Sequence, residues 1–466
     1  MGSSVLTLEQ LPDDVLLVAM HFVSVEDVLS CRLVCKRLCG LALHRDIWRH
    51  RSVADGKSCT GAVLRLAPCL NKLTVKSRVP TLAVTTTRCA VANLELLPDY
   101  ELHRDQVPEC VLALALSVRN QEALGRLRRL KLVIYLPSAD ALLRMVASCS
   151  HLESLTVIGN RGIRHPVLNG PPVPSLREFQ CSLVPSCESF VHTILAGHAA
   201  TLEDVALSGA HETTTSILLA ALPRLHRLRL DDEVRGLEAV AACKTLRDVH
   251  ITLYEDLDNL GKNAAEFLRR AYRLRRVHLE YSAGSDTGAD HCTVLVEALV
   301  SSGPSRVEWL SLVRFEDVRP LLRVLPSLPA LRRLEVDLGV TEEPDDELLK
   351  GITPVTAPAL TLLKIVVSGC PHAWVHGDTA QATLAVNPSL HIQFWCRTVR
   401  KCDPQGCESC MLGCHREVNW DWGSKVGLYL HDPDKCPSPE DHTEDTDDWE
   451  SPFIPKTRAV CTWIHL

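Results

Sequence analysis

A six-residue pattern with apolar residues at its first, fourth and sixth positions recurs ten times, and it constrains the fold more than any other feature. The fourth and sixth residues lie on the same side of an extended chain, so each copy predicts a short strand with one buried face. Neighbouring copies are 21 to 33 residues apart, and they begin at Leu127, Leu152, Leu176, Leu202, Leu225, Leu246, Leu274, Val307, Leu331 and Leu360.

The stretches between these copies read as helices, for example residues 139–148, 188–196 and 263–273. Each unit is therefore expected to be a strand, a turn and a helix, and the units stack as an α/β solenoid over residues 121–395. Strands pair about 4.8 Å apart whereas packed helices need about 10 Å, so the stack must curve with its strands on the concave side. Weaker copies occur earlier, and residues 52–120 are assigned to a linker with atypical capping repeats.

This pattern resembles the repeat of leucine-rich-repeat proteins, which fold as a horseshoe. The chain departs from that family at the turn position, where only the second copy has an asparagine, Asn160. The ladder of buried Asn or Cys side chains is thus mostly missing, and irregular repeats are expected. The alternative is a generic α/β domain with Leu-rich helices, which does not by itself produce ten copies at near-constant spacing.

The segment from Leu11 to Trp48 carries the signals of three short helices. Pro12 suits the first position of a helix, and the two aspartates after it favour the positive end of the helix dipole. Ser24 and Asp27 have the spacing of a capping box and predict a second helix, while Asp46 is expected to cap a third. So short a segment cannot bury all of its apolar side chains by itself. The surplus must face the rest of the chain or another protein.

Three blocks, Leu11–Leu17, Val34–Arg37 and Asp46–Trp48, resemble the F-box in order and separation, and the resemblance covers residues 6–51. One departure is Leu38, where the family often has tryptophan. The resemblance implies a substrate-recognition subunit of a Skp–cullin–F-box ubiquitin ligase, in which the F-box docks on the Skp-family adaptor and the repeats bind a protein substrate. An ordinary three-helix cap on a larger domain is the alternative. By resemblance, the adaptor contact is assigned to Leu11, Pro12, Val15, Leu16, Val28, Leu29, Val34 and Cys35.

Within each predicted strand, the residues between the buried ones point to the concave surface. In the middle of the array these residues are basic, with an aromatic ring beside them. Arginine pairs with carboxylates and phosphates through two parallel hydrogen bonds, and arginine and tryptophan are enriched in binding hot spots. The candidate substrate-binding residues are therefore Arg227, Arg229, Arg276 and Trp309. The alternative is a solvated strand face of mixed charge, which the acidic residues on the same strands favour.

Residues 396–466 differ in composition and are expected to form an irregular, acidic tail rich in Cys and His. Cys407 and Cys410 are spaced as one half of a zinc knuckle, and Cys402 and Cys414 could complete a tetrahedral set of ligands. A second close pair is missing, so ordinary or redox-reactive thiols are an alternative, and the spacing also coincides with one kind of iron–sulfur ligation. No cofactor is expected, with zinc left open.

Composition limits the function classes. The net charge of −7 provides no general attraction to nucleic acid or to an anionic membrane, and no apolar run approaches a bilayer span. Twenty cysteines without a signal peptide indicate a reduced protein of the cytoplasm or nucleus. Catalytic motifs are missing, so a non-catalytic receptor subunit is expected. The alternative is a repeat-based interaction scaffold without a ligase role, with or without a zinc-binding or redox-sensing tail.

Overall fold

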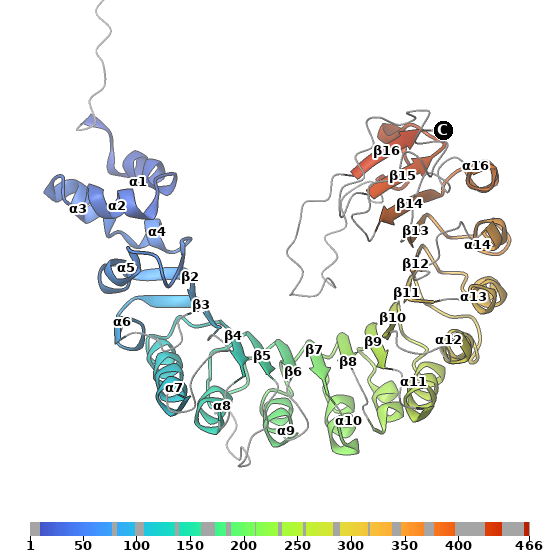
Figure 1. The fold of residues 1–466 in the computed structure, drawn as a ribbon, viewed down its shortest axis with the longest axis horizontal. Helices are drawn as coiled ribbons and strands as arrows, with labels where there is room; N and C mark the ends of the chain where they lie inside the picture. Colours follow the sequence, from blue (N-terminus) through green and yellow to red (C-terminus); the bar gives the residue numbers. More distant parts are fainter. Residues whose placement is uncertain are drawn as a thin grey trace, which may run out of the picture. The chain divides into compact units, whose positions relative to one another are not determined.

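The protein has a mixed α/β fold, and its chain divides into two compact units, Met1–Leu225 and His226–Leu466. In both units, parallel strands alternate with helices in a solenoid-like manner (Figure 1). The computed structural model describes residues 10–76, 82–97, 107–135, 139–159, 173–182, 188–209, 211–231, 235–254, 258–282, 289–315, 317–337, 346–367, 377–396, 425–439 and 461–465.

The first unit begins with four short helices, one more than the sequence predicted: α1 (Asp13–His21), α2 (Val25–Cys31), α3 (Lys36–Ala42) and α4 (Arg45–Trp48). The predicted cap of α2 is confirmed, because Ser24 Oγ accepts a hydrogen bond from the backbone N–H of Asp27 at 3.1 Å. Two expectations about helix starts were wrong. Pro12 precedes α1 as its cap residue, and His44 rather than Asp46 caps α4.

These helices have a small core of their own. Leu16, Val28, Ile47 and Trp48 are all at most 4% exposed, and the indole N–H of Trp48 donates to the Ala42 carbonyl at 2.7 Å. The Arg51 guanidinium donates to the carbonyls of Met20, Val23 and Ile47 near the helix ends, where helix carbonyls lack partners within the helix. Burial lowers the pKa of Arg51. Arg51 thus provides the hydrogen-bond donors for the carbonyls at the end of the helical segment.

After the helices, the described residues of the first unit contain seven strands, which pair in parallel and in chain order. They are β1 (Ser52–Ala54), β2 (Cys69–Val75), β3 (Ala90–Leu96), β4 (Arg129–Ile134), β5 (Ser154–Gly159), β6 (Glu178–Ser182) and β7 (Asp204–Ser208). Between or after them lie α5 (Thr60–Leu66), α6 (Leu82–Thr85), α7 (Val107–Ala123), α8 (Asp140–Ala147), α9 (Glu188–Gly197) and α10 (Thr213–Ala220).

The described residues of the second unit contain nine further strands. They are β8 (Arg227–Asp231), β9 (Asp248–Tyr254), β10 (Arg276–Ser282), β11 (Trp309–Val313), β12 (Arg333–Asp337), β13 (Leu362–Val367), β14 (His391–Cys396), β15 (Lys425–Tyr429) and β16 (Cys461–His465). Its helices are α11 (Asp258–Arg270), α12 (Ala289–Ala298), α13 (Arg319–Val324), α14 (Asp346–Gly351) and α16 (Asp378–Val386), with 3₁₀ helices at Leu237–Ala242, Leu325–Ser327 and Pro433–Lys435.

The tail is more ordered than the sequence predicted. β8 to β14 pair in parallel, β15 then pairs antiparallel with β14, and β16 pairs parallel with β15. The expectation of an irregular tail is therefore wrong for residues 425–429 and 461–465. Trp463 and Ile464 pair with Gly427 and Leu428 of β15.

The periodic apolar residues form the core, as the pattern predicted. In all ten copies, the side chains at the first, fourth and sixth positions are at most 6% exposed. The two weaker copies, at β2 and β3, are buried in the same way. Asn160, the one asparagine at a turn position, lies outside the described residues. Among the described helices, none is both long and apolar enough to cross a membrane.

Polar side chains on the helical side bind the backbone of the preceding repeat. Gln121 accepts from the N–H of Val91 at 2.8 Å and donates to the Cys89 carbonyl at 3.1 Å. Asn387 donates to the Ile352 carbonyl at 3.1 Å. Buried backbone groups outside regular structure need such partners. These single polar residues satisfy the backbone where a regular side-chain ladder is missing.

Candidate partner-binding surfaces

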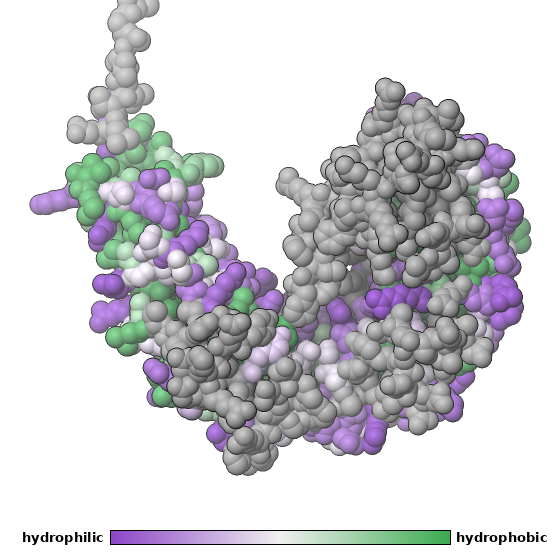
Figure 2. Space-filling view, viewed as in Figure 1, coloured by the Kyte–Doolittle hydropathy of each residue, from purple (hydrophilic) through white to green (hydrophobic). Residues whose placement is uncertain are grey.

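Large apolar side chains are exposed on the N-terminal helices. Val15 and Val18 of α1 and its C-cap residue Phe22 are 43%, 59% and 87% exposed, and their spacing of three and four residues places them on one helix face. Leu33 and Val34, between α2 and α3, are 77% and 69% exposed. Figure 2 shows apolar surface over this part of the molecule. A cluster of this kind is typical of a protein-binding surface.

The predicted adaptor contacts divide into two groups in the structure. Pro12, Val15, Val34 and Cys35 are exposed, and Leu11 and Leu29 are half-buried. Leu16 and Val28, in contrast, are 4% and 0% exposed, so their assignment to the surface is corrected: both belong to the core of the helical segment. Three further residues of this surface, Val18, Phe22 and Leu33, are exposed and were not singled out from the sequence. The helical spacing from Val15 indicates Val18 and Phe22.

An ion pair fixes how two of these helices are arranged. The guanidinium of Arg37, in α3, lies 2.7 Å from the Asp13 carboxylate in the first turn of α1. It also donates to the Leu11 carbonyl just before that helix. Both partners are exposed, so the pair itself adds little to stability. Its role is geometric, because it holds the start of α3, and the Val34 segment before it, beside the start of α1.

The second candidate surface is the strand face of the second unit, opposite the buried side chains. The strand register places Arg227, Asp248, Arg276, Trp309 and Arg333 in one row across β8 to β12. Three of the four predicted substrate-binding residues therefore share a row, and Arg229 begins the next. The guanidinium of Arg276 lies 5.5 Å from the centre of the Trp309 ring, a cation–π contact.

Asp248 lies between two arginines of this row. Its carboxylate is 3.8 Å from Arg227, and burial raises its pKa, although Arg276 and Arg227 oppose that effect. The row thus has more positive than negative charge, with its one carboxylate partly neutralised by neighbours. Such a row can bind an acidic segment of a partner.

The next row contains two adjacent histidines, which the sequence analysis did not single out. Arg229, His250, His278, Ser311, Glu335, Lys364 and Gln393 are aligned across β8 to β14. The rings of His250 and His278 have centres 4.0 Å apart, and burial lowers the pKa of both. Both rings are therefore neutral near pH 7. Lys364 and Glu335 form a buried ion pair at 2.8 Å.

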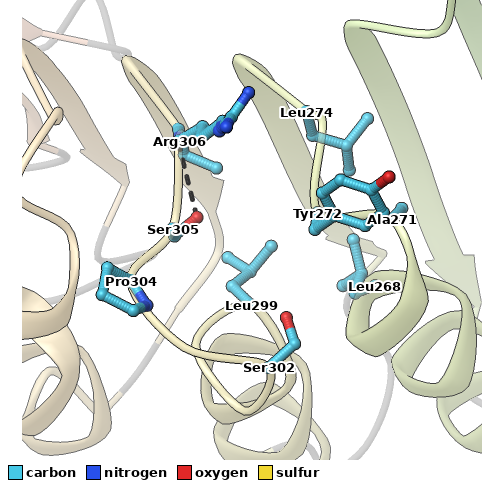
Figure 3. A pocket seen from close by; sticks show the side chains of 10 residues that line it. Leu268, Ala271, Tyr272, Leu274, Leu299, Ser302, Pro304, Ser305 and Arg306 are labelled. Carbon is cyan, nitrogen blue, oxygen red and sulfur yellow. Dashed lines mark hydrogen bonds between the residues drawn. The ribbon is translucent and has the colours of Figure 1, made fainter. Parts of the chain in front are cut away.

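A pocket of about 320 Å³ lies on the helical side of the second unit, around the end of α11 and the segment after α12 (Figure 3). Leu268, Leu274 and Leu299 give it an apolar wall, and Arg306 lies at its edge. Its lining contains no histidine, cysteine or carboxylate. The hydroxyls of Tyr272, Ser302 and Ser305 also line it, so the pocket is an apolar hollow with a few polar groups.

The predicted zinc ligands Cys402, Cys407, Cys410 and Cys414 lie outside the described residues. Among the described cysteines, burial raises the pKa of Cys89 and Cys149 to about 12. A thiol becomes reactive only as its thiolate. These two cysteines are therefore unreactive packing residues, as expected for single cysteines in apolar segments.

Comparison with known proteins supports the assignment of the N-terminal helices. Residues 8–54 match the family described as F-box-like. This match extends three residues past the predicted segment and includes β1. Among curated proteins, no significant match to the chain is found. The chain thus carries an F-box-like domain at its N-terminal end, and F-box domains typically bind Skp-type adaptors.

Proposed function

We propose that this protein is the substrate-recognition subunit of a Skp–cullin–F-box ubiquitin ligase. The observation that supports this most strongly is the cluster of exposed apolar residues on the F-box-like domain: Val15, Val18, Phe22, Leu33 and Val34. Burying an apolar side chain of this size contributes about 1.5–3 kcal/mol. An apolar helical face laid into a groove is a common mode of recognition, and here the groove belongs to the Skp-family adaptor.

The strand–helix body is proposed to be of the leucine-rich-repeat type and to hold the substrate. The ten buried copies of the apolar pattern and the parallel pairing of the strands support this assignment. The row of Arg227, Arg276, Trp309 and Arg333 favours a substrate segment rich in carboxylates or phosphates, which arginine binds through paired hydrogen bonds.

The proposed role involves no covalent chemistry by this chain. A receptor subunit holds a substrate lysine near a charged conjugating enzyme, and binding then raises its effective concentration. The partners are the adaptor, through it a cullin–RING ligase, and a protein substrate. The place of action would be the cytoplasm or the nucleus.

The adaptor contact can be tested with two variants that differ only in position. Leu33→Asp places a charge in the apolar cluster, whereas Leu82→Asp changes a leucine of similar exposure, 76%, on α6. Titration calorimetry with a purified Skp-family adaptor should show at least tenfold weaker binding for Leu33→Asp, about 1.4 kcal/mol, and no change for Leu82→Asp. Equal binding by both variants would exclude this surface as the adaptor contact.

A further inference from the structure

Two histidines and a cysteine, side chains of the types that bind metals, come together beside β14 and β15 in the second unit. His391 is the first residue of β14, His431 follows β15, and Cys436 follows the 3₁₀ helix Pro433–Lys435. The Nε2 atoms of the two histidines are 2.8 Å apart. Cys436 Sγ lies 3.0 Å from Nε2 of His431 and 3.1 Å from Nε2 of His391. The three donor atoms thus form a nearly equilateral triangle.

The other nitrogen of each ring determines where its proton lies. Nδ1 of His391 is 3.2 Å from the Thr361 carbonyl, and Nδ1 of His431 is 3.2 Å from the Pro388 carbonyl. A carbonyl oxygen can only accept, so each neutral ring carries its proton on Nδ1 and directs the lone pair of Nε2 into the triangle. Two lone pairs at this distance repel each other unless a proton or a cation lies between them.

The thiol does not remove this conflict by itself, because its single proton can lie on only one edge of the triangle. The backbone N–H of Ser438 points at Cys436 Sγ at 3.3 Å, which stabilises the thiolate. With the proton gone, the triangle presents two imidazole nitrogens and a thiolate sulfur. Those are the ligand types of zinc. Histidines that bind a metal commonly donate their other N–H to a backbone carbonyl, as both do here.

We infer that His391 Nε2, His431 Nε2 and Cys436 Sγ bind a zinc ion. At ordinary zinc–ligand lengths, a tetrahedral site separates two nitrogens by about 3.3 Å and nitrogen from sulfur by about 3.6 Å. The side chains therefore move apart by about 0.5 Å along each edge when the ion enters. The described residues supply three of the ligands, and a tetrahedral zinc ion takes one further donor.

The environment suits a structural metal. His391 is fully buried, Cys436 is 9% exposed, and the ring of Tyr429 packs 6.0 Å from His391 and 5.3 Å from His431. The ion joins β14 to residues 40 and 45 positions further along the chain, across the antiparallel pair of β14 and β15. Closing such a loop stabilises the pairing that it encloses. Zinc therefore fastens the antiparallel β15 to the end of the parallel sheet.

This site is separate from the ligand set that the cysteine spacing suggested. It uses none of Cys402, Cys407, Cys410 and Cys414, so a variant with all four changed to serine is the appropriate background for a test. In that background, the purified full-length chain is stripped of metal with a chelator and titrated with Zn²⁺. The expected result is one bound equivalent of zinc per chain.

Cobalt(II) provides a readout of the ligands themselves. Bound at this site, it should show tetrahedral d–d absorption together with a thiolate-to-metal charge-transfer band. Cys436→Ser should abolish the charge-transfer band, and His431→Gln should weaken zinc binding roughly 100-fold or more. Cys243→Ser, at another buried cysteine of the same unit, should change neither. Circular dichroism of the metal-free variants reports whether each one folds.

Several results would overturn the proposal. A background chain that binds no zinc would do so, as would Cys436→Ser and His431→Gln variants that keep the affinity and the cobalt spectrum. Copper(II) binds such donors more tightly than zinc in general, so it is titrated in parallel. A chain that takes copper but no zinc would exclude the zinc assignment.

Discussion

His198 shows how one residue links two repeats and makes folding depend on pH. This side chain is 2% exposed, and its Nδ1 accepts hydrogen bonds from the backbone N–H groups of Ser175 and Leu176 at 3.1 and 3.2 Å. An imidazole protonated on both nitrogens cannot accept either bond. Burial lowers the pKa of His198 from 6.5 to about 4. The native fold therefore keeps this ring neutral.

Acid should destabilise the first unit through His198. Between pH 6.5 and pH 4 the unfolded chain binds a proton on this histidine that the native chain does not, so the free energy of unfolding falls as pH falls. The contribution of His198 is fully present above pH 6.5 and is lost by about pH 4, amounting to about 3 kcal/mol. Urea unfolding at a series of pH values measures it.

The pH dependence is tested by replacing this imidazole with an amide, which takes up no proton in this pH range. His198→Gln should reduce by about one the number of protons taken up on unfolding between pH 4 and 6.5. An unaltered proton uptake in His198→Gln would mean that the native ring is already protonated.

At the scale of single elements, strands were predicted well and helix ends less well. A strand of the array needs alternate apolar residues because one face is buried, and that requirement is visible in the sequence at Leu310 and Leu312 of β11. β14 to β16 were not predicted, since β15 and β16 come after the repeats have ended. The cap of α4 by His44 was missed because a nearby aspartate is the commoner cap residue.

A cavity in one strand should destabilise its own repeat and the neighbouring repeats. Leu310, in β11, is fully buried, and Leu310→Ala should cost about 2–5 kcal/mol of local stability. In a stack of repeats, each contacts only its neighbours, so hydrogen exchange should accelerate in β10, β11 and β12. The amides of α1 to α4 should be unaffected.

Val294→Ala is the matched control for this cavity, because Val294 is 39% exposed on α12 in the same part of the unit. Its exchange rates should stay within about twofold of the wild type, as for most surface substitutions. Acceleration spread evenly over the whole second unit in Leu310→Ala would contradict a nearest-neighbour stack.

At the scale of the molecule, the sequence predicts which residues share a surface only where those residues hold the same position in successive repeats. Arg227, Arg276 and Trp309 were found because each holds the same position in its strand, and parallel register then aligns them. His391, His431 and Cys436 hold no such position. They come together only because β15 pairs antiparallel with β14, and no pattern in the sequence predicts that pairing.

The two candidate surfaces belong to different units. The proposed function therefore predicts that a substitution in one surface abolishes binding there and leaves binding at the other unchanged. Leu33→Asp lies in the first unit, and the pair Arg276→Glu with Trp309→Ala lies in the second. The first variant should lose the adaptor and keep any partner captured through the strand face. The second should keep the adaptor and lose that partner. Affinity capture from cells with the proteasome blocked, followed by quantitative mass spectrometry, measures both.

The proposed function predicts that ubiquitin transfer needs both surfaces, because a receptor subunit of this kind acts by bringing a substrate lysine and a charged conjugating enzyme together. In a reconstituted reaction with the captured partner, each variant alone should therefore reduce transfer as strongly as the two combined. Tyr272→Ala, on the helical side of the second unit and 57% exposed, serves as the control and should retain full transfer. A partner that both surface variants capture and modify normally would leave the strand face without a role in substrate binding.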